Sequence, residues 1–154
     1  MKNKNIILLV ITILIAFVCV SFAGVYTFTQ AAYNEKGCDW ANIDHIELRT
    51  ASGIPRTTSC KCSYSTSTSI KTSTFMLNSK TLDVSAFIED NNYKLYTKDS
   101  DMKIEDLIAN EPNRASIAKK KTLYFRSDET EDDSYRMLFD AEAGKLWVSI
   151  HYKK

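Results

Sequence analysis

Hydrophobic residues form one continuous run near the start of the chain and short, interrupted groups after it. The stretch from Ile6 to Phe28 contains 23 residues and no charge. At about 1.5 Å rise per residue, a helix of this length covers roughly 34 Å, which is enough to cross a hydrocarbon core of about 30 Å. The pattern therefore predicts a membrane-spanning helix or a signal sequence.

The residues around this run predict its orientation and leave its processing open. Lys2 and Lys4 precede it, which predicts a cytoplasmic N-terminus and an extracytoplasmic C-terminal domain. The run is longer than the apolar part of a typical cleaved signal. However, Ser21-Phe-Ala23 and Thr29-Gln-Ala31 both fit a small-x-Ala cleavage site. We therefore expect a single-pass protein held in the membrane by residues 6–28, with secretion after cleavage as the alternative.

Alternating patterns beyond the leader predict strands. Twelve of the eighteen residues from Thr57 to Thr74 are Ser or Thr, and Cys60, Cys62 and Tyr64 alternate among them, which indicates a hairpin with a hydroxyl-rich outer face. The last third predicts a three-stranded antiparallel meander over 123–152. Its final strand places Leu146, Val148, Ile150 and Tyr152 on one face and Trp147, Ser149 and His151 on the other. A glycine with positive φ at Gly144 fits the connection before that strand.

Other segments predict two short helices and two further strands. Val84, Phe87 and Ile88 have helical spacing behind Asp83, a suitable N-cap. Ile104, Leu107 and Ile108 have the same spacing, with Ser100 or Asp101 as the cap and Pro112 after the end. Alternation predicts strands over 46–50 and 93–97.

These elements predict an α+β fold. We expect residues 1–28 to form the anchor or signal, 29–37 a short tether, and 38–154 a single extracytoplasmic domain. Its mainly antiparallel sheet would have five to seven strands, including the C-terminal meander, with the two short helices packed on one face. An antiparallel sheet can leave its other face to solvent, and function would then lie on that face.

The charge balance argues against nucleic acid as a partner. Beyond the leader the chain has 18 Lys and Arg against 19 Asp and Glu, which is far from the basic surface of a nucleic-acid binder. Lys119-Lys120-Lys121 is the only basic run, and an acidic run over 128–133 follows it. We interpret the two runs as the solvated edges of one hairpin.

Three cysteines beyond the leader predict a disulfide in an oxidising compartment. Cys60 and Cys62 project from the same face of a strand and would be strained if bonded to each other, so Cys38 is expected to pair with one of them. A zinc site formed by the three thiols and His45 is the alternative. It lacks the usual ligand spacing, because a single residue separates Cys60 from Cys62.

The sequence contains no motif that specifies catalysis. His45 and His151 are the only imidazoles, and no nucleophile elbow, zinc-protease motif or phosphate-binding glycine loop is present. Asp99-Ser-Asp101 and the acidic run do not form an EF-hand loop. We therefore expect no catalytic residues, cofactor or metal, and a non-enzymatic role.

The small size of the domain, its expected export and its predicted disulfide favour a protein-binding module. One form of this hypothesis is an inhibitor or immunity-type protein that recognises a toxin or hydrolase outside the cytoplasm. The alternatives are an extracytoplasmic hydrolase that works through two converging carboxylates, and a structural subunit of a membrane-spanning assembly.

Overall fold

The computed structural model describes residues 2–33, 40–97, 99–100 and 102–153, which form two compact units. The first unit is helix α1 (Lys2–Tyr33). Its segment Val10–Phe28 is long and apolar enough to span a membrane or to serve as a signal sequence. The helix continues through the first five residues of the predicted tether, and residues 34–37 lie outside the described part of the chain.

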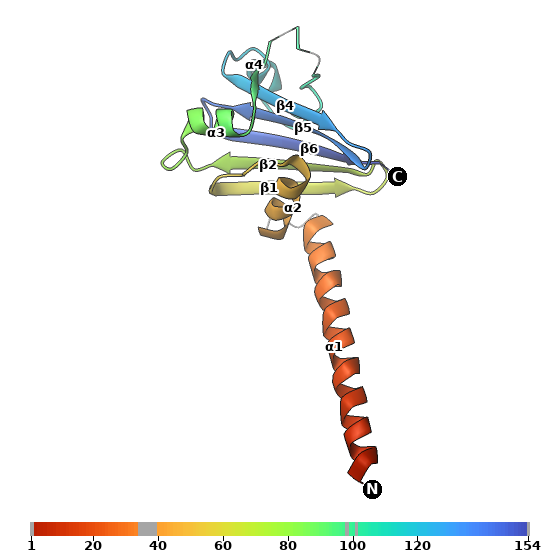
Figure 1. The fold of residues 1–154 in the computed structure, drawn as a ribbon. Helices are drawn as coiled ribbons and strands as arrows, with labels where there is room; N and C mark the ends of the chain where they lie inside the picture. Colours follow the sequence, from red (N-terminus) through yellow and green to blue (C-terminus); the bar gives the residue numbers. More distant parts are fainter. Residues whose placement is uncertain (1, 34–39, 98, 101, 154) are drawn as a thin grey trace. The chain divides into compact units, whose positions relative to one another are not determined.

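The second unit is built on a six-stranded sheet in which every neighbouring pair is antiparallel. The strand order is β1-β2-β6-β5-β4-β3, so the last strand along the chain lies in the middle of the sheet (Figure 1). The strands are β1 (Thr57–Ser65), β2 (Ile70–Leu77), β3 (Lys94–Leu95), β4 (Leu123–Glu129), β5 (Asp133–Asp140) and β6 (Lys145–Tyr152). Together with the helices described below, this sheet confirms the predicted α+β class.

The predicted hairpin and the C-terminal meander are both present. Strands β1 and β2 pair as one hairpin, and β4, β5 and β6 pair in succession. Gly144 has a φ of 63° in the β5–β6 connection, as expected. The strand predicted over 93–97 is shorter, because only the two residues of β3 pair with β4.

Both faces of the central strands are covered, which corrects the expectation of a solvated face. One face carries a core formed by strand residues Phe75, Met137, Phe139, Leu146, Val148 and Ile150 with Ile46 and Phe87 from two helices. On the opposite face, Trp147, Leu138 and Leu123 lie beneath Met102, Ile104, Ile108 and Ile117. Trp147 is therefore only 2% exposed although it points away from Val148.

Residues 46–50 are helical, so the strand predicted there is wrong. They belong to α2 (Trp40–Thr50), whose buried side chains Asn42, Ile46 and Thr50 recur every four residues. That spacing places them on one side of a helix. The apparent alternation arose because Leu48, 81% exposed, points into solvent.

One of the two predicted helices is present and the other is replaced by turns. Helix α3 (Val84–Asp90) has Asp83 as its N-cap, whose side chain accepts a hydrogen bond from the Ala86 N–H at 3.0 Å. Residues 105–110 form consecutive turns, and the short helix α4 (Arg114–Ile117) follows Pro112. Ser100 closes a turn with Thr97 instead of capping a helix, and Asp101 lies outside the described residues. Phe87 of α3 and Ile117 of α4 belong to the cores on opposite faces, so the predicted packing on one face is also wrong.

Candidate functional site

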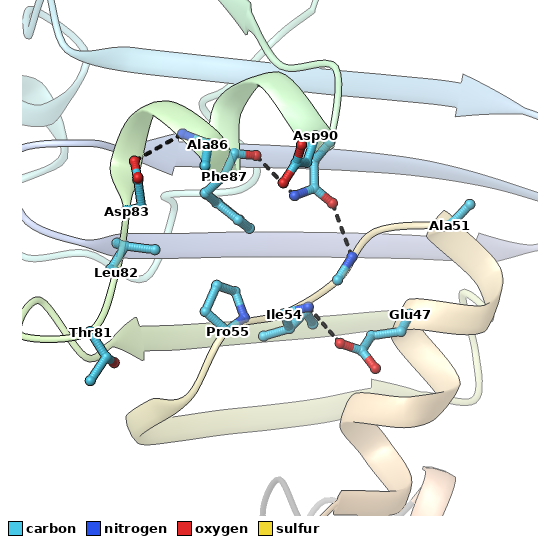
Figure 2. Close-up of a pocket in the computed structure, with 12 residues that line it drawn as sticks. Glu47, Ala51, Ile54, Pro55, Thr81, Leu82, Asp83, Ala86, Phe87 and Asp90 are labelled. Carbon is cyan, nitrogen blue, oxygen red and sulfur yellow. Dashed lines mark hydrogen bonds between the residues drawn. The ribbon is translucent and has the colours of Figure 1, made fainter.

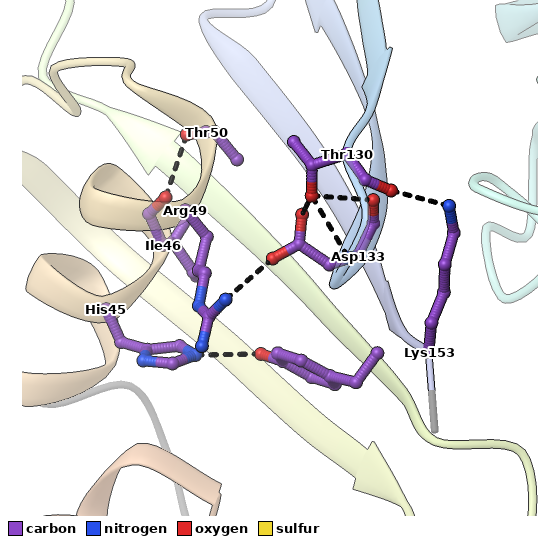
Figure 3. A network of polar contacts seen from close by, with 8 residues as sticks. His45, Ile46, Arg49, Thr50, Thr130, Asp133 and Lys153 are labelled. Atoms are coloured by element: carbon purple, nitrogen blue, oxygen red, sulfur yellow. Dashed lines mark hydrogen bonds and ion pairs between the residues drawn. The ribbon is translucent and has the colours of Figure 1, made fainter.

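Polar contacts hold α2 against the sheet (Figure 3). His45 Nε2 lies 2.9 Å from the Tyr152 hydroxyl of β6, and Lys71 of β2 donates to Asn42 Oδ1 at 2.7 Å. Arg49 donates to Asp133 Oδ2 at 3.0 Å. Ile46 is the one fully buried hydrophobic side chain among the described residues of this helix. We call these three contacts between α2 and the sheet the α2 clamp.

The α2 clamp changes the interpretation of the charged runs. Asp133 lies at the start of β5 with its side chain 3% exposed, where it also accepts a hydrogen bond from the Thr130 hydroxyl at 3.1 Å. Lys119-Lys120-Lys121 lies before β4, whereas the acidic run covers the last two residues of β4, the turn after it and the first residue of β5, so the two runs are at opposite ends of β4. Lys120 pairs with Asp140 at 2.8 Å and Glu142 at 3.1 Å. The interpretation as two solvated edges of one hairpin is therefore wrong for Asp133 and Lys120.

His45 should make the stability of the domain depend on pH. Burial, with the nearby charges of Lys71 and Arg49, lowers the pKa of His45 to about 4 against the opposing effect of Asp133. Because the folded pKa is below the unfolded value of 6.5, folding favours the neutral ring, and stability is lost as pH falls from about 6.5 towards 4. The loss should be at most about 1.4 kcal/mol per pH unit from this residue.

Urea unfolding of wild type and His45→Gln between pH 7 and 4.5 would measure this contribution. The free energy of unfolding should fall less steeply with acidification in His45→Gln than in wild type. His151→Gln, at an exposed position of β6, is the control and should keep the wild-type dependence. Parallel pH profiles for wild type and His45→Gln would contradict the assignment.

A hollow of about 480 Å³ lies between α2, the loop after it and α3 (Figure 2). The loop is held on both sides: the Ile54 N–H donates to Glu47 Oε1 at 2.5 Å, and the Gly53 N–H donates to Asn91 Oδ1 at 3.0 Å. Asn91 in turn donates to the Phe87 carbonyl at 2.9 Å, which joins the loop to α3. The apolar lining residues are Ala51, Ile54, Pro55, Leu82, Ala86 and Phe87.

A second depression adjoins the hollow along the exposed side of α2. It shares Glu47, Ala51 and Gly53 with the hollow and adds Asp44, Leu48 and Ser52. We call the two together the α2–α3 hollow. The sequence does not reveal this feature, because its residues come from 44–55 and 81–91, and no spacing within either segment indicates that they meet.

A smaller groove of about 280 Å³ lies on the other face of the β1–β2 hairpin. Hydroxyl side chains line it, as the Ser/Thr pattern predicted, and Ser63 Oγ lies 2.8 Å from Thr72 Oγ1. At its wall, Glu111 accepts hydrogen bonds from Lys145 at 2.8 Å and Trp147 Nε1 at 2.9 Å. Burial alone would raise the pKa of Glu111, but these hydrogen bonds and the charges of Lys145 and Lys61 together outweigh it and lower the pKa. Glu111 is therefore an anchor for the segment that covers Trp147.

The residues predicted to form a disulfide are only partly described. Cys60 and Cys62 face the same core from β1, as expected, with Cys62 3% exposed and Cys60 half-buried. Cys38 lies outside the described residues, so the disulfide stays a prediction. Within the described residues, no three carboxylate, imidazole or thiol groups are placed to hold a metal ion.

The two histidines differ in their exposure to solvent. His45 is half-buried in the α2 clamp and His151 is exposed on β6.

The structure shows an α+β domain with an N-terminal apolar helix. Comparison with protein-family models, curated proteins and solved structures gives no significant match.

Proposed function

We propose that this chain is a single-pass membrane protein whose extracytoplasmic domain binds another protein. The α2–α3 hollow is the observation that carries the proposal. It combines an apolar floor with an adjoining leucine, Leu48, that is 81% exposed. A single exposed leucine is ordinary, but an apolar side chain beside an apolar hollow gives a partner both a protrusion and a recess to pack against.

The anchor is expected to remain attached to the domain. Helix α1 runs without a break through both candidate cleavage sites, and its apolar segment is of membrane-spanning length. N-terminal sequencing of protein from its native host should therefore begin before Ile6, in the membrane fraction. A soluble protein beginning near Gly24 or Ala32 would show that the leader is a cleaved signal.

The disulfide is expected to join Cys38 to Cys62 in preference to Cys60. Cys62 is the more deeply buried of the two on the face that also contacts Ile46 of α2, and Cys38 precedes that helix by two residues. Closing this loop should add about 3 kcal/mol to stability in the chain-entropy model. Peptide mapping under non-reducing conditions should recover a Cys38–Cys62 peptide. A Cys38–Cys60 peptide, or three free thiols, would contradict the assignment.

Site-specific photo-crosslinking tests the binding function. A benzophenone amino acid at position 48 of the full-length protein, irradiated in native membranes, should give one discrete adduct with another protein. The exposed position makes this substitution compatible with folding. The matched control is the same group at Leu95, a leucine that is 52% exposed on β3. No discrete adduct from position 48, or the same adduct from both positions, would contradict protein binding at the α2–α3 hollow.

A further inference from the structure

The lining of the α2–α3 hollow carries charge of one sign. Its ionisable residues are Asp44, Glu47, Asp83 and Asp90, and no Lys, Arg or His is among its lining residues. Beyond the leader the chain has 18 basic and 19 acidic residues, so this local excess does not follow from composition. Arg126 reaches the loop by donating to Ala51 O at 3.3 Å and Ser52 Oγ at 2.6 Å, but it does not line the hollow.

Two of the four acids are already engaged and two remain for a ligand. Glu47 accepts the Ile54 N–H and Asp83 accepts the Ala86 N–H, so both hold the walls in place. Asp44 and Asp90 are exposed, and their carboxylates make no hydrogen bond or ion pair with another described residue. Asp90 lines the hollow at the end of α3, and Asp44 of α2 lines the adjoining depression. The apolar floor of the hollow lies between the two helices (Figure 2).

We propose that the α2–α3 hollow receives a cationic segment of the partner protein, in which Lys or Arg residues flank an apolar side chain. This rests on the proposed protein-binding function and names the chemistry of the partner. The apolar side chain packs on Ile54, Pro55 and Leu82, while the cations pair with Asp44 and Asp90. Complementary charge of this kind raises the association rate and selects among partners.

A bound metal ion is the competing occupant of an acidic hollow. It would need several carboxylate oxygens converging within coordination distance. In the part of the chain that the structure describes, no such group of three donors is found. The large apolar share of the lining also favours a side chain over a hydrated ion.

Binding of two designed peptides to the full-length protein in nanodiscs of zwitterionic lipid tests the proposal. One fluorescent peptide has a central Leu flanked by Lys and Arg, and the other has Glu in place of each base. The basic peptide should bind, measured by fluorescence anisotropy, and its affinity should fall as salt increases. The acidic peptide should not bind.

Matched charge removals locate the site. Asp44→Asn with Asp90→Asn should weaken binding of the basic peptide by about tenfold or more, equivalent to about 1.4 kcal/mol. Glu131→Gln with Asp132→Asn removes the same charge from the exposed β4–β5 turn and should leave affinity unchanged. Equal binding of both peptides, or equal loss in both double variants, would overturn the proposal.

The crosslinking and peptide-binding experiments distinguish failure of the protein-binding proposal from failure of the cationic-segment proposal. A discrete adduct from position 48 without binding of the basic peptide would overturn the cationic chemistry and leave protein binding standing. Absence of both would overturn both.

Discussion

Val148→Asp should abolish folding of the domain. Val148 is 2% exposed in the middle of β6, where it lies opposite Ser73 of β2 and Met137 of β5. An aspartate there would lose apolar burial and place a carboxylate in the core, and each change costs several kcal/mol. A domain with about 5–15 kcal/mol of stability would not withstand both.

Expression and limited proteolysis of the full-length protein would decide this prediction. Val148→Asp should be degraded under conditions where wild type resists the protease. His151→Asp is the control on the same strand, because His151 is exposed, and it should resist proteolysis like wild type. A protease-resistant Val148→Asp variant would mean that the buried face of β6 has been assigned wrongly.

Arg49→Met should be more destabilising than Asp133→Asn, although both break the same ion pair. The Arg49 side chain is 39% exposed, whereas that of Asp133 is 3% exposed. Removing Arg49 leaves a buried carboxylate whose remaining side-chain donor among the described residues is Thr130, a loss that we place at about 2–3 kcal/mol. Removing the charge of Asp133 lets the Arg49 guanidinium turn to water, so the loss should be about 1 kcal/mol.

Urea unfolding in detergent, followed by the fluorescence of buried Trp147, would measure both variants at pH 7. The double variant Arg49→Met/Asp133→Asn should be close to Asp133→Asn, because it contains no buried charge without a partner. If Arg49→Met proves no worse than Asp133→Asn, water must reach the Asp133 carboxylate in the folded domain.

The sequence predicted the sheet better than the helices, for a physical reason. In the meander, buried residues such as Leu146, Val148 and Ile150 are hydrophobic, so their spacing is visible in the sequence. On α2 the buried side includes Asn42 and Thr50, which satisfy their polar groups through Lys71 and the Ile46 carbonyl. Hydrophobic spacing in a sequence gives no sign of polar residues that are buried together with their hydrogen-bond partners.

The segment over 104–108 has the hydrophobic spacing of a helix but forms turns instead. Its isoleucines do have helical spacing, and they are buried over Trp147 as a helix would bury them. Pro112 disfavours helical geometry at the residue before it, which is Glu111, the residue that binds Lys145 and Trp147. The contacts that favour the turns come from β6, more than 30 residues later, and local propensity does not contain them.

The α2–α3 hollow could not have been predicted from the sequence for a similar reason. Its walls meet through the hydrogen bond between Gly53 and Asn91, which are 38 residues apart. Asp90 lines the hollow and Asp44 the adjoining depression, and nothing in either segment of the sequence indicates that the two come together.

The position of β6 in the sheet has a consequence for biosynthesis. Strand β2 pairs with β6 and not with β3, so the β1–β2 hairpin has no second neighbour until the chain has been made as far as residue 152. A ribosome adding about 5–20 residues per second needs roughly 4–15 s for the intervening stretch of about 75 residues. During that interval the inner edge of β2 and the side chain of Phe75 are uncovered in the emerging chain. The strand order therefore makes this edge the part of the emerging domain that is most open to pairing with another chain.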